Sequence, residues 1–290
     1  MSVLTKLLAI DRRIIFLVIA AAVVLSLFFP MRLEVAVTPP VESIYKTIES
    51  LPEGSVVLVS NDYDPSSKPE LYPMSVALFR HCFKKNLKVV AMTLWVTGEG
   101  LIADALNAAL KDERFKDKKE GEDYVFLGAK VGGSAVIMGM GQDIAGTFPK
   151  DYKKRPVTDL PLMKNLKTLT DFDYVVSIAA GSPGVDDWVI YGSEYLRKKK
   201  PKRVELAAGC TGVMATQYYP YLDSGQINGL LGGMKGAAEY ESLIQWKDQG
   251  TYQMDAESVT HIIIIAFVIL GNIAYFTIRK SRGNVTGEAK

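Results

Sequence analysis

The chain has 290 residues, of which 48% are hydrophobic and 23% are charged, and its formal net charge is +2 at pH 7. This near-neutral net charge does not point to nucleic-acid binding. The length suffices for at least one substantial hydrophobic core. We therefore expect a globular domain and no nucleic-acid partner.

The first feature in chain order is a nearly unbroken apolar run at residues 14–29. With Pro30 and Met31 it reaches the length of a membrane-spanning helix. The run shows no polar face at helical period, which disfavours a buried core helix. The residues after it offer no small-residue cleavage site, so we expect the run to stay attached as an anchor.

Strand-like and helix-like segments then alternate up to residue 260. Helices are expected at residues 41–51, 73–85, 100–115, 134–146, 186–198 and 227–244. Strand-like runs lie at residues 55–60, 87–95, 123–128, 174–180 and 203–209. These runs are apolar throughout, which is typical of strands covered on both faces. The pattern predicts a doubly wound α/β domain with a mostly parallel sheet of about five strands and helices on both faces.

Polar residues follow the predicted strands at the edge where ligands bind in such sheets. The ligand-binding candidates are Asn61, Asp62, Asp64, Thr97, Glu99, Lys130, Ser182, Asp187 and Thr211. Aspartates also favour strand ends, turns and helix caps without any ligand, and this alternative applies to Asp62 and Asp64. The loop around Ser182 leads into two aspartates, which suit the start of a helix better than they suit a phosphate.

Two histidines limit the chemistry that this chain can perform. His81 is expected inside a helix and His261 at the border of a second apolar run, so neither supports a histidine-dependent triad or a zinc site of His and Cys. The remaining metal hypothesis is a weak one, a divalent cation held by Asp62, Asp64 and Asp187. Phosphate-binding and dinucleotide fingerprints do not occur, and no cofactor is implied.

The two cysteines, Cys82 and Cys210, lie far apart in the sequence. We expect them to be small buried apolar residues, with a disulfide between them as the alternative.

Glycines recur at helical spacing near the C-terminal end of the domain. Gly225, Gly229 and Gly233, and separately Gly232 and Gly236, stand four positions apart. On a helix they would form a smooth stripe, and each glycine costs about 1 kcal/mol relative to alanine. The stripe suggests close approach of another backbone, either the domain's own sheet or a helix of another chain.

A second apolar run covers residues 262–278 and is interrupted by Asn272, an amide that favours helix pairing in a membrane. Basic residues flank the outer ends of both runs, so both termini are expected in the cytoplasm. The expected organisation is a cytoplasmic N-terminus (1–13), a transmembrane helix (14–31), an extracytoplasmic α/β domain (32–260), a transmembrane helix (261–278) and a cytoplasmic tail (279–290).

These patterns indicate a two-span protein of the plasma membrane whose outer domain binds a partner protein or a small polar ligand. We expect it to be a subunit of a membrane assembly, in contact with the lipid bilayer and with copies of itself or other membrane subunits. The alternative is a membrane-tethered hydrolase or transferase that uses carboxylates at the strand edge, with or without a divalent cation.

Overall fold

The computed structural model describes residues 11–29, 34–196 and 204–287. The chain divides into two compact units. One is Glu34–Thr251, and the other combines Met1–Leu33 with Tyr252–Lys290. Each unit is described by itself below.

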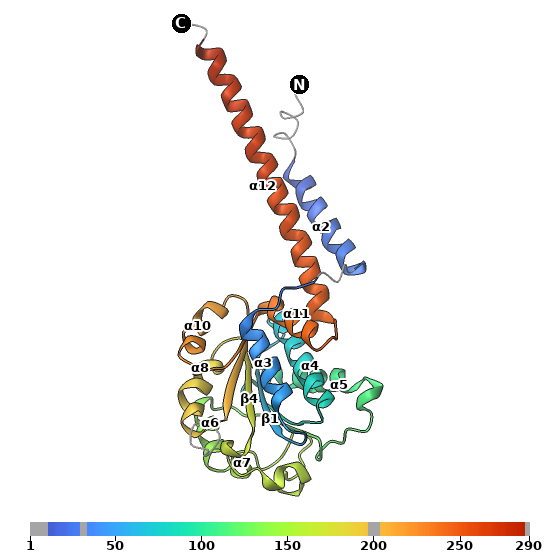
Figure 1. Ribbon diagram of the computed structural model, residues 1–290, viewed down its shortest axis with the longest axis vertical. Coiled ribbons are helices and arrows are strands. Elements are labelled where there is room, and N and C mark those ends of the chain that lie inside the picture. The colour runs from blue at the N-terminus through green and yellow to red at the C-terminus, as the bar shows by residue number, and fades with distance from the viewer. Residues whose placement is uncertain (1–10, 30–33, 197–203, 288–290) are drawn as a thin grey trace. The chain divides into compact units, whose positions relative to one another are not determined.

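A parallel sheet of six strands forms the centre of the unit Glu34–Thr251 (Figure 1). The strands are β1 (Val56–Asp62), β2 (Lys88–Thr93), β3 (Tyr124–Ala129), β4 (Tyr174–Ala179), β5 (Glu205–Cys210) and β6 (Leu230–Gly232). Their order across the sheet is β3-β2-β1-β4-β5-β6, and every neighbouring pair is parallel. The predicted α/β class and the five predicted strands are confirmed, and the sheet has one strand more than expected.

Helices connect the strands. The elements are α3 (Pro39–Ser50), α4 (Lys68–Lys84), α5 (Glu99–Leu110), α6 (Ser134–Gln142), α7 (Ile144–Thr147), α8 (Val185–Asp187), α9 (Ser193–Leu196), α10 (Ala215–Asp223) and α11 (Gly233–Leu243). Short 3-10 turns lie at Val96–Gly98, Glu113–Phe115, Val157–Asp159, Pro161–Asn165 and Leu169–Asp171, and the π-helical turn Trp188–Gly192 joins α8 to α9.

The helices form a layer on each side of the sheet (Figure 1). Buried side chains of α3, α4, α5 and α11 share one hydrophobic cluster with the sheet, and those of α6 to α10 share a second cluster on the opposite face. Consecutive residues of β1 alternate between the two, since Val57 and Val59 belong to the first cluster and Leu58 to the second. The apolar strands predicted from the sequence are therefore covered on both faces.

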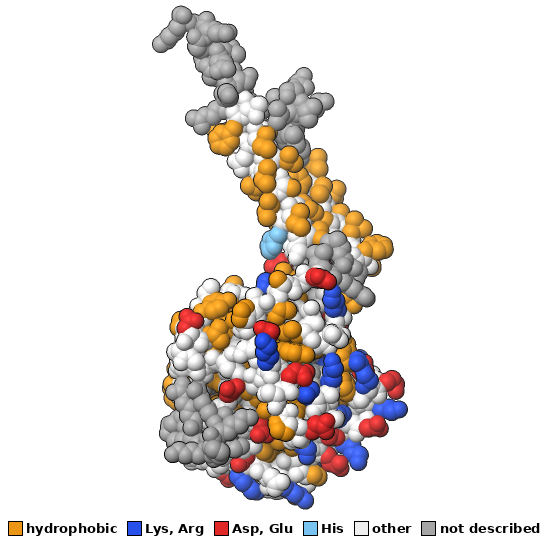
Figure 2. Space-filling view, in the orientation of Figure 1, with side chains coloured by type: hydrophobic (Ala, Val, Ile, Leu, Met, Phe, Trp, Pro, Cys, Tyr) orange, Lys and Arg blue, Asp and Glu red, His pale blue; other side chains and the backbone are white. Residues whose placement is uncertain are grey.

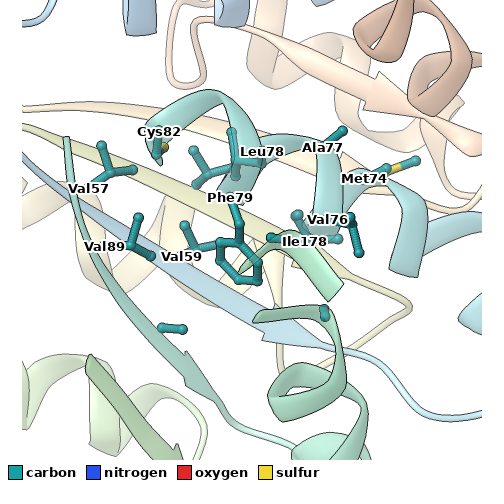
Figure 3. Close-up of a cluster of buried hydrophobic side chains, with 14 of the residues drawn as sticks. Val57, Val59, Met74, Val76, Ala77, Leu78, Phe79, Cys82, Val89 and Ile178 are labelled. Atoms are coloured by element: carbon teal, nitrogen blue, oxygen red, sulfur yellow. The ribbon is translucent and has the colours of Figure 1, made fainter. Parts of the chain in front are cut away.

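Figure 3 shows how α4 packs on the first face of the sheet. Phe79 and Leu78 are fully buried and belong to the same cluster as Val59 on β1 and Ile178 on β4. Full burial of one such side chain stabilises the fold by about 1.5–3 kcal/mol. The helix begins earlier than the predicted residue 73, because Pro69 occupies its first turn, where a missing N–H does no harm.

The predicted helix at residues 227–244 is wrong in its first part. Residues Leu230–Gly232 form β6, and α11 starts only at Gly233. Gly225 lies before the strand in a turn with a φ of +67°, and Gly233 has a φ of +59° at the helix start. The recurring glycines therefore do not lie on one helix, and a smooth helical stripe is not formed.

Close backbone approach does explain several of these glycines, and the neighbour belongs to the same domain. A Cβ atom on Gly229 would lie 2.4 Å from Cγ1 of Ile44 and 2.6 Å from the carbonyl oxygen of Pro40. On Gly236 it would lie 2.8 Å from the backbone of Leu231, and on Gly232 it would lie 3.2 Å from Cβ of Ala215. The domain's own strand and helices thus account for these contacts.

The second unit contains α2 (Arg12–Phe28) and most of α12 (Gln249–Gly287). In the described residues, the segment Gln249–Thr277 of α12 is the one helix long and apolar enough to cross a membrane, judged by length and composition. Helix α2 has 17 residues, fewer than the roughly 20 of a typical span. Apolar side chains along both helices are exposed, for example Leu17 at 71% and Ile262 at 63% (Figure 2).

Candidate functional site

The strand order creates a reversal point in the middle of the sheet. Strands β2 and β3 lie on one side of β1, whereas β4, β5 and β6 lie on the other. Helix α4 after β1 and helix α8 after β4 cover opposite faces, so the loops that leave the two strands diverge. Ligands of open parallel sheets bind in the crevice at this point, outside the carboxyl ends of the strands. We use the name β1–β4 crevice for this region at the carboxyl ends of β1 and β4, which the strand order alone defines.

Asp62 is the last residue of β1 and therefore stands at this carboxyl end of the strand. Its side chain is fully buried and faces the same side of the sheet as α8. One carboxyl oxygen accepts a hydrogen bond from the Ser60 hydroxyl at 2.7 Å, and the other accepts one from the Leu94 backbone N–H at 2.6 Å. These partners fix the side chain and come from β1 and from the loop after β2.

The pKa of Asp62 is raised to about 7, mainly because burial disfavours the charged carboxylate. The hydrogen bonds from Leu94 and Ser60 act in the opposite direction, and the negative charge of Asp187 raises the pKa further. A carboxyl group that exchanges its proton near neutral pH, placed at a strand-end crevice, is a candidate for binding or catalysis.

Asp187 enters the crevice from α8, on the β4 side. Its Oδ2 atom accepts a hydrogen bond from the Gly184 N–H at 3.0 Å and a longer one from the Ser182 hydroxyl at 3.4 Å. Ser182 is exposed, whereas Asp187 is half-buried. The predicted capping role of Asp187 is confirmed by the Gly184 contact, and Asp187 is also close enough to Asp62 to influence the pKa of Asp62.

The loop after β4 is folded tightly against the strand. A Cβ atom on Gly184 would lie 2.3 Å from the Gly181 carbonyl oxygen and 2.5 Å from Cβ of Ala179, so this position accepts only glycine. The indole N–H of Trp95, which follows β2, donates to the Pro183 carbonyl oxygen at 2.8 Å. Loops after β2 and β4 are thereby linked across the end of β1.

Asn61 and Asp64 do not share this arrangement with Asp62. Asn61 is buried on the opposite face of the sheet, where its Oδ1 accepts a hydrogen bond from the Ser75 hydroxyl at 2.8 Å. Asp64 accepts hydrogen bonds from the backbone N–H and the hydroxyl of Ser66, at 3.0 and 2.6 Å. The Ser66 hydroxyl is the main reason that the pKa of Asp64 is lowered. Asp64 therefore stabilises its own turn.

The other candidates from the sequence are spread along the same edge. Glu99 accepts a hydrogen bond from the Ala129 N–H at 2.8 Å and joins α5 to the end of β3. Thr97 is exposed and Lys130 is half-buried. Thr211 follows β5 and is 7% exposed, and its hydroxyl has no hydrogen-bond partner within the described chain. The structure thus brings Asp62, Ser182 and Asp187 together and leaves the others apart.

No group of three or more His, Cys, Asp or Glu side chains among residues 11–29, 34–196 and 204–287 is arranged to hold a metal ion. Asp62, Asp64 and Asp187 do not form such a group. Cys82 and Cys210 are free and buried on opposite faces of the sheet, and burial raises the pKa of each thiol to about 12. The prediction that they are small buried residues is confirmed.

Two residues of the crevice were not among the predicted site residues. Ser60 holds Asp62, and Trp95 holds the loop after β4. Alternation along β1 would have placed Ser60 and Asp62 on one face, because they are two positions apart. Trp95 stands at the end of a predicted strand, but its contact is with a residue 88 positions away, which local sequence patterns do not reveal.

The structure defines a class of protein: an α/β domain whose sheet has the order 3-2-1-4-5-6 of doubly wound nucleotide-binding folds, without their glycine-rich first turn. Comparisons with family models, with curated proteins and with solved structures find no match to this chain. The function is therefore argued from the residues of the crevice.

Proposed function

We propose that this chain is a membrane-anchored protein whose α/β domain lies outside the cytoplasm and binds a small polar ligand in the β1–β4 crevice. The observation that carries the ligand site is Asp62, a fully buried carboxyl group with a pKa of about 7 beside Asp187. A carboxylate has about four acceptor positions. Asp62 accepts two hydrogen bonds from the described chain, so its acceptor capacity is only partly used there.

The side chains of the crevice favour a ligand that donates hydrogen bonds. Ionised aspartates only accept, and Asp62 and Asp187 together disfavour a second anion nearby. A neutral or cationic molecule that carries hydroxyl or amino groups would meet Asp187 and the exposed Ser182 hydroxyl. It would also bring donors close to Asp62.

The test is thermal unfolding of the full chain in detergent with a panel of sugars, polyols, amino acids and polyamines. A ligand that binds only the folded state at about 100 times its Kd stabilises it by about 2.7 kcal/mol. We expect at least one donor-rich compound to raise the Tm of the native protein and of Asp64→Asn, the control outside the crevice. The Asp187→Asn and Ser182→Ala variants should lose the shift. Equal shifts in all four proteins would place the ligand elsewhere.

Membrane anchoring is supported by α12, whose segment Gln249–Thr277 has the length and composition of a span, and by the exposed apolar side chains of α2. We propose two spans, formed by residues 14–31 and 261–278, with both termini in the cytoplasm. Addition of protease to intact cells should cleave the α/β domain and leave an epitope at either terminus protected. Cleavage of the terminal epitopes in intact cells would contradict this orientation.

Assembly with a second copy or with other membrane subunits is also part of the proposal. The glycines of residues 225–236 do not support it, since their neighbours lie in the same domain. Asn272 donates to the Val268 carbonyl oxygen of its own helix at 2.8 Å. The supporting feature is Gly271, where an added Cβ would meet open space, so that another helix has room to approach. Gly271→Leu should lower the oligomer fraction in cross-linking, whereas an unchanged fraction would remove this helix face from the interface.

A membrane-tethered hydrolase or transferase is the second candidate. It is favoured by the pKa of Asp62, because a general acid or base works best when its pKa lies near the working pH. A thermal shift produced by Mg²⁺ or Ca²⁺ and abolished in Asp62→Asn would support this candidate. A shift produced only by organic ligands would favour the binding protein.

A further inference from the structure

Three consecutive residues of α11 make buried polar contacts with three different parts of the chain. Glu239 is 1% exposed, Tyr240 is fully buried and Glu241 is 2% exposed. Buried carboxylates are costly unless hydrogen bonds compensate them. Both glutamates have such partners, and neither belongs to the β1–β4 crevice.

Glu239 holds the segment through which the chain enters the domain. Its Oε2 atom accepts hydrogen bonds from the backbone N–H of Thr38 at 2.7 Å and from the Thr38 hydroxyl at 2.6 Å. Its Oε1 atom pairs with Lys235, one turn earlier on α11. Thr38 is the N-cap residue of α3, and its side chain makes no capping hydrogen bond to that helix.

Glu241 holds the segment through which the chain leaves the domain. Its two oxygens accept hydrogen bonds from the N–H groups of Asp248, Gly250 and Thr251, at 2.8–2.9 Å, and from the Thr251 hydroxyl at 2.7 Å. Gly250 and Thr251 lie in the first turn of α12, and Asp248 directly precedes the helix. A Cβ atom on Gly250 would lie 3.0 Å from Cβ of Ala237, so the start of α12 is in direct contact with α11.

The two glutamates face different sides of the same helix. Residues two positions apart on an α-helix are separated by about 200° around its axis. Helix α11 therefore lies between the entering and the leaving segment. On each side a glutamate of α11 accepts hydrogen bonds from the backbone N–H and the hydroxyl of one threonine, Thr38 or Thr251. Between them, Tyr240 contacts His81 of α4 at 2.7 Å, and the other ring nitrogen of His81 lies 3.0 Å from Glu49 of α3.

The first residue of α11 reaches the edge of the sheet where the crevice lies. A Cβ atom on Gly233 would lie 3.0 Å from the Cα of Gly212 and 3.1 Å from Oε2 of Glu70. Glu70, in the first turn of α4, accepts a hydrogen bond from the Gly212 N–H at 2.7 Å. One helix thus contacts both chain connections, the first turn of α4 and the loop that follows β5.

We propose that α11 is a coupling element that links the two chain segments leading to the proposed membrane anchors, so that a displacement of one segment is transmitted to the other. The proposal rests on the anchoring given under the proposed function. Coupling between two sites is reciprocal, so a change on the Thr38 side must affect the Thr251 side, and the reverse.

Hydrogen exchange of the full chain in detergent micelles tests this without any ligand. Glu239→Gln and the milder Thr38→Val loosen the entering segment, and Glu241→Gln and Thr251→Val loosen the leaving segment. We expect each variant to accelerate amide exchange at least about fivefold, the lower end of typical coupling strengths, both at residues 37–38 and at residues 248–251. Amides of β1 should keep their protection. Glu42 forms an exposed ion pair with Lys46 on α3, and the control variant Glu42→Gln should leave the exchange rates of both segments unchanged.

Faster exchange confined to the mutated side would overturn the proposal, and so would an equal increase in β1, which reports general unfolding. The outcome is independent of the crevice ligand, because the ligand test uses other residues and another measurement. A protein that binds no small molecule can still show reciprocal exchange. Conversely, a protein that binds a small molecule can fail to show reciprocal exchange.

Discussion

Two buried acids of this domain, Glu241 on α11 and Asp62 at the end of β1, differ in how far their hydrogen-bonding capacity is used. Glu241 accepts four hydrogen bonds, about as many as a carboxylate can. Asp62 is more deeply buried and accepts two. Burial raises the pKa of both groups, and the pKa of Asp62 reaches about 7. A carboxylate whose acceptor positions are all used fixes the structure, whereas one that accepts fewer hydrogen bonds can more readily take up a proton.

The largest effect should come from truncating the saturated acid. Glu241→Ala leaves three backbone N–H groups and one buried hydroxyl without their acceptor, and loss of such a network costs about 3–5 kcal/mol. Urea unfolding of the α/β domain, followed by the fluorescence of its tryptophans, measures the loss. A cost below about 1 kcal/mol would show that the start of α12 does not depend on Glu241.

Gly229 and Gly225 provide a matched pair for the role of the glycines. Gly229→Ala places a Cβ atom against Ile44 and Pro40, so we expect a loss of about 2–4 kcal/mol from overpacking and backbone shifts. The Cβ atom of Gly225→Ala would have no atom of the described chain within 4 Å. This variant only strains a turn with positive φ, so we expect a loss of about 1 kcal/mol in the free energy of unfolding. Equal losses of unfolding free energy in the two variants would mean that close packing against α3 is not what requires a glycine at position 229.

Asp62, the partly saturated acid, should make the free energy of unfolding depend on pH. The pKa of Asp62 is higher in the folded state than in the unfolded state, so protonation of Asp62 favours folding. This contribution to the free energy of unfolding is fully present below about pH 4, the unfolded-state pKa of an aspartate. This contribution is lost as pH rises through about 7. It amounts to a few kcal/mol, since a tenfold change in proton affinity is about 1.4 kcal/mol.

Asp62→Asn removes the titration and keeps the shape, because an amide can still accept from Leu94 and can donate to Ser60. Between pH 4 and 8 the free energy of unfolding should fall more steeply for the native protein than for this variant. Parallel pH profiles would show that Asp62 does not hold its proton in the folded state.

The smallest effect on stability is expected at the mouth of the crevice. Ser182 is exposed and its hydroxyl makes only a long contact with Asp187, so Ser182→Ala should change the unfolding free energy by less than about 0.5 kcal/mol. The same variant should lose ligand-induced stabilisation. A large loss of stability would instead assign Ser182 to the fold.

Sequence reasoning identified the α/β class because five apolar strands and their intervening helices have clear local patterns. It missed β6, since Leu230–Gly232 is only three residues long and lies within glycines that also fit helical spacing. The placement of Asp62, Ser182 and Asp187 near one edge of the sheet could be predicted, because they lie at the end of the first predicted strand and in the segment that follows the fourth. Alternation along the strand would also have placed Asn61 on the other side of the sheet from Asp62, where the structure has it.

The roles of Glu239 and Glu241 depend on distant partners. Thr38 lies 201 positions from Glu239, and nothing in the local sequence links them. The partners of Glu241 lie only 7 to 10 positions away, but the bonds require α11 to end and residues 248–251 to return to it. Such contacts become visible only when the packing of the helices is known.

The most direct test of the central claim is an NMR titration of the Asp62 side-chain carbon, in the native protein and in Asp187→Asn. We predict a midpoint near pH 7 in the native protein and a lower midpoint in the variant, because the variant removes a negative charge close to Asp62. A midpoint near 4 in the native protein would contradict the account, because Asp62 would then be an ordinary ionised carboxylate at the end of a strand.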